Sequence, residues 1–250
     1  MTELACSMES LSLSVVIPAF NEENIIENSI RLLWDELRSF CGDFEIIVVD
    51  DGSVDSTRAI LEDLKKEISQ LEIFSNLHNM GLGCAIRTGL SLASKDLVLY
   101  TDADMPVAYK AIRSAVKRLS YSGSDMVLGT RIDRAAESAL RFMVSGVYNW
   151  LVRLLFGLKT RDINFAFKLM KRSVVRCLRL TSNGAFIDAE IVIQAINLGF
   201  VVEQIPLAYQ ARKDSASRLF NSSTIVMTLA DLARNFHRLH RIRRAQCKSA

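Results

Sequence analysis

Residues 97–107 read LVLYTDADMPV, and this stretch indicates both the fold class and the place of a candidate site. Its first four residues are apolar, as in a strand that is buried on both faces of a parallel sheet. Asp102 and Asp104 follow, and Pro106 then interrupts the strand pattern. Because residues i and i+2 of an extended chain point to the same side, the two carboxylates can face one cation or one polar group.

The aspartate pair has two interpretations. Ligation by oxygen alone, with no His or Cys nearby, favours Mg²⁺ or Mn²⁺, usually shared with phosphate oxygens. A solvated turn is the alternative, because a lone Asp-x-Asp pattern is weak evidence for a metal site. The apolar strand before the pair and the proline after it favour the cation, which would also offset the repulsion between Asp102 and Asp104.

Strand-like and helix-like segments alternate on both sides of this stretch. Such alternation predicts right-handed β-α-β crossovers, and therefore an α/β fold with a Rossmann-like, mostly parallel central sheet flanked by helices. The apolar runs of predicted strands cover 13–18, 44–50, 71–75, 96–102 and 125–130, and the helical patterns between them cover 22–40, 55–69, 81–93 and 107–119.

The pattern changes after residue 130. A long amphipathic or apolar segment covers 135–158, a helical pattern covers 184–197, and a strand follows at 200–206. Residues 222–241 form an amphipathic pattern with Leu232, Phe236 and Leu239 on its apolar stripe. No repeat, low-complexity tract or Gly/Pro-rich linker divides the chain, so we expect a single domain.

Composition narrows the class of protein. The chain has 250 residues, 50% of them hydrophobic and 24% charged, as in one large globular domain, and its net charge of +3 is too small to indicate a nucleic-acid partner. Its five cysteines are scattered without a Cys-x-x-Cys pair, which excludes a zinc ribbon and predicts reduced thiols in a cytosolic protein.

Neither a signal peptide nor a membrane span is expected. Residues 1–14 lack the basic start and apolar centre of a signal peptide. The most apolar long stretch, 142–158, contains Asn149 and Arg153 and falls short of the roughly 20 apolar residues that span a bilayer.

Polar residues gather where the predicted parallel strands end. The first strand ends in PAFNEE (18–23), the second in VDDGSVDST (49–57) and the fourth in TDAD (101–104). Ligands of an open parallel sheet bind outside the carboxyl ends of its strands, so these segments should converge on one crevice. Asp50 or Asp51 could accept a hydrogen bond from a nucleobase or a ribose, although turn formation and helix capping also explain them.

A glycine-rich stretch, HNMGLGCAIRTG, occupies residues 78–89. It resembles a phosphate-binding loop at a helix N-terminus, but it lacks the P-loop lysine and the full G-x-G-x-x-G spacing. Gly81 and Gly83 therefore have two equally good explanations, which are the close approach of a ligand and a turn of the backbone.

Further candidate residues are scattered over the second half of the chain. Each of them also fits an ordinary solvated position. Arg131 is the strongest of them, because it directly follows a predicted strand on the crevice side. The others are Asp162, Lys168, Asp188, Glu190, Arg212, Ser217 and Arg218.

Eight motifs occur in order along residues 13–220: VVIPAFNEE, EIIVVDDGSVDST, NMGLGCAIRTG, YTDADMP, VLGTR, RDINFAFKLMKR, GFVVEQIPL and RKDSASRL. As an ordered set they resemble family 2 glycosyltransferases, which have the GT-A fold. The chain is most similar to the branch of dolichyl-phosphate mannose synthases and polyprenyl-phosphate glycosyltransferases. One such motif would be weak evidence, whereas the ordered set is highly specific.

The resemblance implies a role for each matching residue. Asp102 and Asp104 would position the sugar nucleotide and hold Mg²⁺ or Mn²⁺. The nucleoside would lie against Pro18, Ala19, Asn21, Glu22 and Asp50 or Asp51. Phosphate oxygens of donor and acceptor would contact Arg131, Arg212 and Arg218, and the sugar and acceptor side would be lined by Asp162, Lys168, Asp188 and Glu190. Gly81 and Ser217 complete the expected substrate-binding set.

The implied reaction is an inverting transfer of one sugar from a nucleoside diphosphate to a polyprenyl phosphate, with Asp102, Asp104, Arg131 and Asp188 as the catalytic residues. The pattern Arg212-x-x-x-x-Ser217-Arg218 favours GDP-mannose as donor, and UDP-glucose is the alternative. If the acceptor were a glycan hydroxyl, a base would be needed, and Asp188 would be the candidate.

Two other classes of function compete with this one. A nucleotidyltransferase would carry a basic glycine-rich loop after the first strand, where this chain has acidic NEE (21–23). A non-catalytic scaffold would have no reason to retain Asp102 and Asp104 beside Arg131.

A lipid acceptor also implies a membrane surface. The segment 135–158 and the basic helix after 221 combine apolar faces with basic residues, as interfacial helices do, although core packing explains either equally well. A membrane-spanning tether protein is the other means of attachment. We therefore expect a peripheral protein at the cytoplasmic face of a membrane, with a tail at 1–12, the catalytic domain at 13–220, and a C-terminal amphipathic helix and tail at 221–250.

Overall fold

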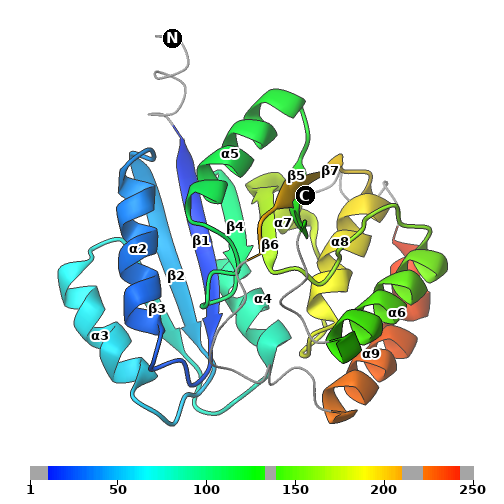
Figure 1. Ribbon diagram of the computed structural model, residues 1–250, viewed down its shortest axis with the longest axis horizontal. Helices are drawn as coiled ribbons and strands as arrows, with labels where there is room; N and C mark the ends of the chain where they lie inside the picture. Colours follow the sequence, from blue (N-terminus) through cyan, green and yellow to red (C-terminus); the bar gives the residue numbers. More distant parts are fainter. Residues whose placement is uncertain (1–10, 133–138, 210–221, 243–250) are drawn as a thin grey trace.

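Seven strands form one sheet in the computed structural model, which describes residues 11–132, 139–209 and 222–242 (Figure 1). The strand order across the sheet is β3-β2-β1-β4-β6-β5-β7. The strands are β1 (Ser12–Ala19), β2 (Asp43–Asp50), β3 (Leu71–Ser75), β4 (Leu97–Thr101), β5 (Met126–Arg131), β6 (Phe167–Lys171) and β7 (Val202–Leu207). The α/β fold with a mostly parallel sheet is confirmed.

One strand of this sheet runs against the others. β6 lies between β4 and β5 and pairs antiparallel with both, so that Lys168 stands beside Tyr100 of β4. The sequence analysis did not identify β6, because Lys168 interrupts its apolar pattern. In the structure Lys168 is as fully buried as its strand neighbours Phe167 and Leu169.

Helices connect the strands close to where periodicity placed them. The ends differ from the expected ranges by a few residues, which is usual for helix termini. The helices are α2 (Ile26–Arg38), α3 (Thr57–Glu67), α4 (Leu82–Leu92), α5 (Lys110–Ser122), α6 (Ala139–Phe156), α7 (Arg172–Cys177), α8 (Ile187–Leu198) and α9 (Ser222–Arg241).

The sheet separates two hydrophobic cores. Alternate residues of β1 face opposite sides, with Val15 in one core and Val16 in the other. The first core contains the buried faces of α2, α3 and α5, and the second contains those of α4, α7 and α8 (Figure 1). The result is a three-layer arrangement, which explains why the central strands read as continuous apolar runs.

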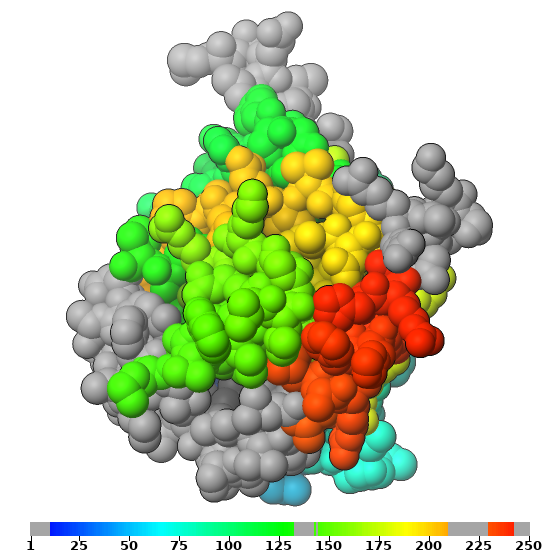
Figure 2. Space-filling view, turned by 90° about the vertical axis from the view of Figure 1, so that its right-hand side faces the viewer, coloured from blue at the N-terminus to red at the C-terminus, as the bar shows by residue number. Residues whose placement is uncertain are grey.

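α6 and α9 lie side by side over the second core (Figure 1 and Figure 2). The ring centroids of Phe156 on α6 and Phe236 on α9 are 5.7 Å apart, and Leu232 and Leu239 of α9 are buried. Within the described ranges, no helix has both the length and the hydropathy that a membrane span requires.

The cysteines depart from expectation at one position. Cys41 and Cys84 carry free thiols, and burial raises the pKa of the Cys41 thiol to about 11. Cys177, in contrast, is disulfide-bonded, so the expectation of reduced thiols is wrong there. Pairing depends on which cysteines the fold brings together, and sequence spacing alone does not determine that.

Candidate functional site

Three neighbouring parallel strands, β1, β2 and β4, end at one edge of the sheet, the lower edge in Figure 1. Ala19 of β1 pairs with Asp50 of β2, so the loops that follow these strands begin side by side. Pro18 and Ala19 are themselves buried within β1, which leaves the following residues to face this edge. The predicted convergence of the strand ends is therefore present.

The loops after β1 and β2 are joined by side chain–backbone hydrogen bonds. The Asn21 amide N–H donates to Ser53 Oγ at 2.9 Å, and Asn21 Oδ1 accepts from the backbone N–H of Val54 at 2.8 Å. The Glu22 N–H donates to Thr57 Oγ1 at 2.8 Å. Asn21 has a φ of 53°, a left-handed conformation that asparagine tolerates better than most residues.

Asp50 and Asp51 are buried and bonded within the protein. Asp50 Oδ1 accepts from the Ser53 N–H at 3.0 Å. Asp51 accepts three hydrogen bonds, from the Asn76 side chain at 2.7 Å and from the backbone N–H groups of Met80 at 2.9 Å and Gly81 at 2.8 Å. The Asp51 carboxylate thus ties the loop after β2 to the glycine-rich loop before α4.

Gly81, just before α4, and Gly83, in the first turn of α4, pack against another backbone segment. Gly81 has a φ of 96°, and a Cβ there would lie 2.5 Å from the carbonyl oxygen of Asn183. A Cβ on Gly83 would lie 2.2 Å from the carbonyl oxygen of Ser182, and the Gly83 N–H donates to Asn183 at 2.7 Å. The close approach is made by residues 182–183, so the structure favours the backbone explanation over a phosphate loop at Gly81.

Asp102 and Asp104 stand just beyond the end of β4. Asp102 is half-buried and Asp104 is exposed. The Met105 N–H donates to the Asp102 carbonyl at 3.1 Å, and Met105 has a φ of 43°, a rare conformation for a residue of its kind. A tight turn therefore presents the two carboxylates at the edge of the sheet, and local strain of this sort often marks functional sites.

The electrostatics of this turn suit a cation. Burial, together with the nearby carboxylates of Asp104 and Asp188, raises the pKa of Asp102 well above its ordinary value. In the described part of the chain, no group of three or more His, Cys, Asp or Glu side chains could hold a metal by itself. Two carboxylates that share Mg²⁺ or Mn²⁺ with substrate phosphates and water need no third protein ligand, so the residues present fit such an ion.

Beside the turn, Lys168 and Asp188 form a buried ion pair. Lys168 Nζ contacts the Asp188 carboxylate and donates to the carbonyl of Phe165 at 2.8 Å, and it lies 5.3 Å from the ring centroid of Tyr100. Burial raises the pKa of Asp188, against the opposing effect of Lys168. The pair fastens β6 to the start of α8, within electrostatic range of Asp102.

Arg131 and Asp162 form a second buried pair. Arg131 Nε and Nη2 donate to the two carboxylate oxygens of Asp162 at 2.7 and 2.8 Å, and both side chains are only 7% exposed. The guanidinium also lies over the rings of Phe165 and Tyr209. These contacts favour a role for Arg131 in positioning the end of β5 over a direct contact with phosphate.

Glu190, which the resemblance places on the substrate side, is held inside the protein by several hydrogen bonds. Its side chain is fully buried in α8 and accepts hydrogen bonds from the backbone N–H groups of Thr181 and Ser182 at 3.0 and 2.9 Å. It also accepts from the Gln194 side chain and pairs with Arg238 of α9. These bonds hold the backbone at residues 181 and 182, next to the glycine loop, and favour a positioning role for Glu190.

Arg212, Ser217 and Arg218 lie outside the described residues. The sequence analysis assigned no role to Ser53 and Asn76, which fasten the loops at Asn21 and Asp51, respectively. Their small polar side chains follow strand ends, which was the only available signal.

Residues 14–179 match the family model described as Glycosyl transferase family 2. The glycosyltransferase AglD of Haloferax volcanii is 31% identical over 218 residues, which is 84% of this chain but 35% of AglD, so the chain spans about a third of that relative. The dolichyl-phosphate beta-glucosyltransferase ALG5A of Trichomonas vaginalis is 28% identical over 92% of this chain and 75% of its own length.

A solved structure has the same fold. Glucosyl-3-phosphoglycerate synthase from Mycobacterium tuberculosis, in complex with Mn²⁺, uridine diphosphate and phosphoglyceric acid, superposes with a TM-score of 0.73. The two chains are 20% identical, and the match covers 94% of this chain and 82% of the synthase.

Proposed function

The chain belongs to glycosyl transferase family 2, and from that premise we propose that it transfers a sugar from a nucleoside diphosphate sugar to a polyprenyl phosphate. The observation that carries the proposal is the tight turn after β4, which presents the Asp102 and Asp104 carboxylates together at the carboxyl edge of the sheet. ALG5A, by its name, acts on a dolichyl phosphate, which supports this class of acceptor.

The donor would lie across the loops after β1, β2 and β4. Backbone and side-chain groups around Asn21, Glu22 and Asp50 would contact the nucleoside, and Asp102 and Asp104 would hold Mg²⁺ or Mn²⁺ together with the diphosphate. The bound cation would neutralise charge that develops on the departing diphosphate. The M. tuberculosis synthase was crystallised with Mn²⁺ and uridine diphosphate, in agreement with a divalent metal in this fold.

The acceptor explains why a histidine base is not needed. A phosphate monoester with a second pKa near ~6 is largely dianionic at neutral pH, so one of its oxygens can attack the anomeric carbon directly. The bond from that carbon to the diphosphate oxygen breaks as the new bond forms, which inverts the anomeric centre. Asp188 is already paired with Lys168, which supports a positioning role for it over that of a general base.

Two donor sugars are candidates. GDP-mannose is favoured by the Arg212-x-x-x-x-Ser217-Arg218 pattern, and UDP-glucose by the name of ALG5A. Since the proposed acceptor is a lipid, we propose that the reaction takes place at a membrane surface. The protein would bind there as a peripheral protein, on the cytoplasmic face. A membrane-spanning tether partner is the other means of attachment.

One assay tests the proposal. Purified protein is incubated with Mn²⁺ or Mg²⁺, a detergent-dispersed polyprenyl phosphate and a panel of labelled GDP- and UDP-sugars. We expect label from one donor in the lipid fraction, dependent on the added metal. Label transferred only to phosphoglycerate or to a glycan hydroxyl, offered in parallel, would overturn the polyprenyl-phosphate assignment.

A further inference from the structure

One face of α6 carries an apolar stripe that the described protein leaves in solvent. Met143, Val147, Trp150 and Leu154 are 64%, 64%, 56% and 64% exposed. Their spacing of four, three and four residues places them on one side of the helix. On the opposite side, Val152 is fully buried in the second core.

α6 thus has two apolar sides. A surface helix of a globular protein has one apolar stripe, facing the core, and polar residues elsewhere. Large apolar side chains that gather on one exposed helix side are unfavourable in water and indicate a surface that something else covers.

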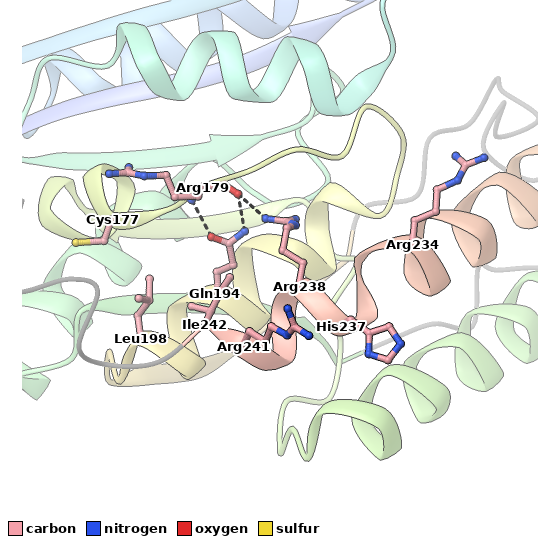
Figure 3. A pocket seen from close by; sticks show the side chains of 9 residues that line it. All are labelled: Cys177, Arg179, Gln194, Leu198, Arg234, His237, Arg238, Arg241 and Ile242. Carbon is pink, nitrogen blue, oxygen red and sulfur yellow. Dashed lines mark hydrogen bonds between the residues drawn. The ribbon is translucent and has the colours of Figure 1, made fainter.

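The helix beside this stripe is basic. Arg234, His237 and Arg241 of α9 are exposed and line, together with Arg179, a cavity of about 850 Å³ (Figure 3). Arg238 lines the same cavity but is held by Glu190 and by the carbonyl of Arg179 at 2.8 Å. None of the residues that line this cavity belongs to the candidate donor site.

The apolar and basic features belong to one face. Phe156, at the end of α6, stacks on His240 of α9 with ring centroids 5.0 Å apart. Figure 2 shows α6 and α9 adjacent on the same side of the molecule. We call the stripe of α6 together with Arg234, His237 and Arg241 the α6–α9 face.

We propose that the α6–α9 face docks on a bilayer that contains anionic phospholipids, with the α6 stripe in the headgroup layer and the α9 arginines on lipid phosphates. Apolar side chains with an interfacial tryptophan, flanked by basic residues, suit such a surface. Pairing of two copies through this face would bring their basic helices together, which opposes it as an occupant. The inference rests on the proposed function only because a lipid acceptor requires a bilayer.

Vesicle flotation tests the proposal. Purified protein is mixed with vesicles of phosphatidylcholine alone, or of equal parts phosphatidylcholine and phosphatidylglycerol. We expect flotation with the anionic vesicles, release by high salt, and little binding to the neutral ones. Arg234→Gln with Arg241→Gln should weaken partition about thirtyfold, or about fivefold for each arginine, and Trp150→Ser with Leu154→Ser about tenfold.

Matched controls come from elsewhere on the surface. Arg38→Gln with Arg58→Gln changes two exposed arginines on α2 and α3, and Tyr121→Ser with Val201→Ser changes two exposed large side chains that are not part of the face. Both controls should float like the wild type. Equal loss in the controls, or wild-type flotation of both test variants, would overturn the proposal.

A fluorescence measurement needs no variant of the face. The chain has two tryptophans, so Trp34→Phe leaves Trp150 as the reporter. Its emission should shift to the blue on anionic vesicles, and an unchanged spectrum would count against docking through α6. Concentration-dependent dimerisation that the Trp150→Ser, Leu154→Ser variant abolishes would show that a second copy covers the face instead.

The outcomes also separate docking from transfer. Flotation without transfer from any donor would leave docking intact and overturn the proposed function. Transfer to a detergent-dispersed acceptor without flotation would leave the proposed function intact and overturn docking.

Discussion

At the scale of single residues, the chemistry centres on Asp102 and Asp104. Asp102 is the more buried of the two, and its carboxylate lies near those of Asp104 and Asp188. A bound cation would offset the repulsion between these carboxylates, and the neighbouring Lys168 already pairs with Asp188 and donates to the Phe165 carbonyl.

Replacing Asp102 or Asp104 by Ala should therefore lower sugar transfer by at least about a hundredfold, because the charge on the departing diphosphate is no longer neutralised. Mn²⁺ with the nucleoside diphosphate should raise the melting temperature of the wild type but not of either variant. Both variants should still unfold cooperatively, since neither Asp102 nor Asp104 belongs to a hydrophobic core. Near wild-type turnover of either variant in EDTA would refute the metal site.

The Arg131–Asp162 pair gives a second prediction. Arg131→Gln leaves a buried carboxylate without its guanidinium and should destabilise the protein by about 3–5 kcal/mol in urea unfolding. Adding Asp162→Asn removes the unpaired buried charge, so the double variant should recover most of the stability. If Arg131 is a positioning residue, the double variant should also recover most of the activity. A double variant that is stable but inactive would instead indicate that Arg131 binds phosphate directly.

At the scale of elements, the glycine loop before α4 is fitted to residues 182–183. Gly83→Ala should cost about 1–3 kcal/mol or more, because its Cβ would meet the Ser182 carbonyl at 2.2 Å and backbone cannot easily yield. Gly146→Ala on α6 is the matched control. Nothing lies within 4 Å of its Cβ, so it should stabilise by about 0.5–1 kcal/mol. Equal effects of the two changes in urea unfolding would refute the close approach.

The start of α3 gives a prediction about pH. Asp55 Oδ1 accepts from the Thr57 N–H at 3.0 Å and Oδ2 from the Glu23 N–H at 3.2 Å. Burial acts to raise the pKa of Asp55, but the hydrogen bonds from Thr57 and Glu23 outweigh it, so the pKa lies below its ordinary value. Asp55→Ala should cost about 1 kcal/mol at neutral pH.

That stabilisation has a definite pH window. A carboxylate with a lowered pKa in the folded state contributes fully above its unfolded pKa of about 3.9, and the contribution disappears as the pH falls through the lower folded value. The difference between wild type and Asp55→Ala in unfolding free energy should therefore shrink on acidification. A difference that is constant down to the acid transition would contradict the hydrogen-bonded carboxylate.

At the scale of the whole molecule, α9 is part of the core. Leu232 and Leu239 are buried, Asn197 donates to the Leu239 carbonyl at 2.9 Å, and Arg238 pairs with Glu190. A chain that stops at residue 221 should lose about 3–6 kcal/mol from the two leucines alone. Denaturant unfolding compares it with the full chain. Equal stability of the two would make α9 dispensable.

Long-range pairs of this kind also limit what the sequence could predict about the site. The Asp102–Asp104 turn follows a continuous apolar strand, so its place at the edge could be predicted from local pattern alone. The function of Glu190 could not, because its partner Arg238 lies 48 residues away in sequence. Likewise, no local signal shows that Gly81 and Gly83 face residues 182–183.

What the sequence by itself determined is the parallel sheet, its helices, its family and the edge where Asp102 and Asp104 meet, because hydrophobic periodicity and ordered motifs act over short spans of chain. Only the tertiary structure decided that β6 is a strand, that Lys168 and Asp188 share a buried site, and that Arg131 binds Asp162. Each of these depends on charged groups that are stable in a buried place only when an opposite charge, distant in sequence, is folded against them.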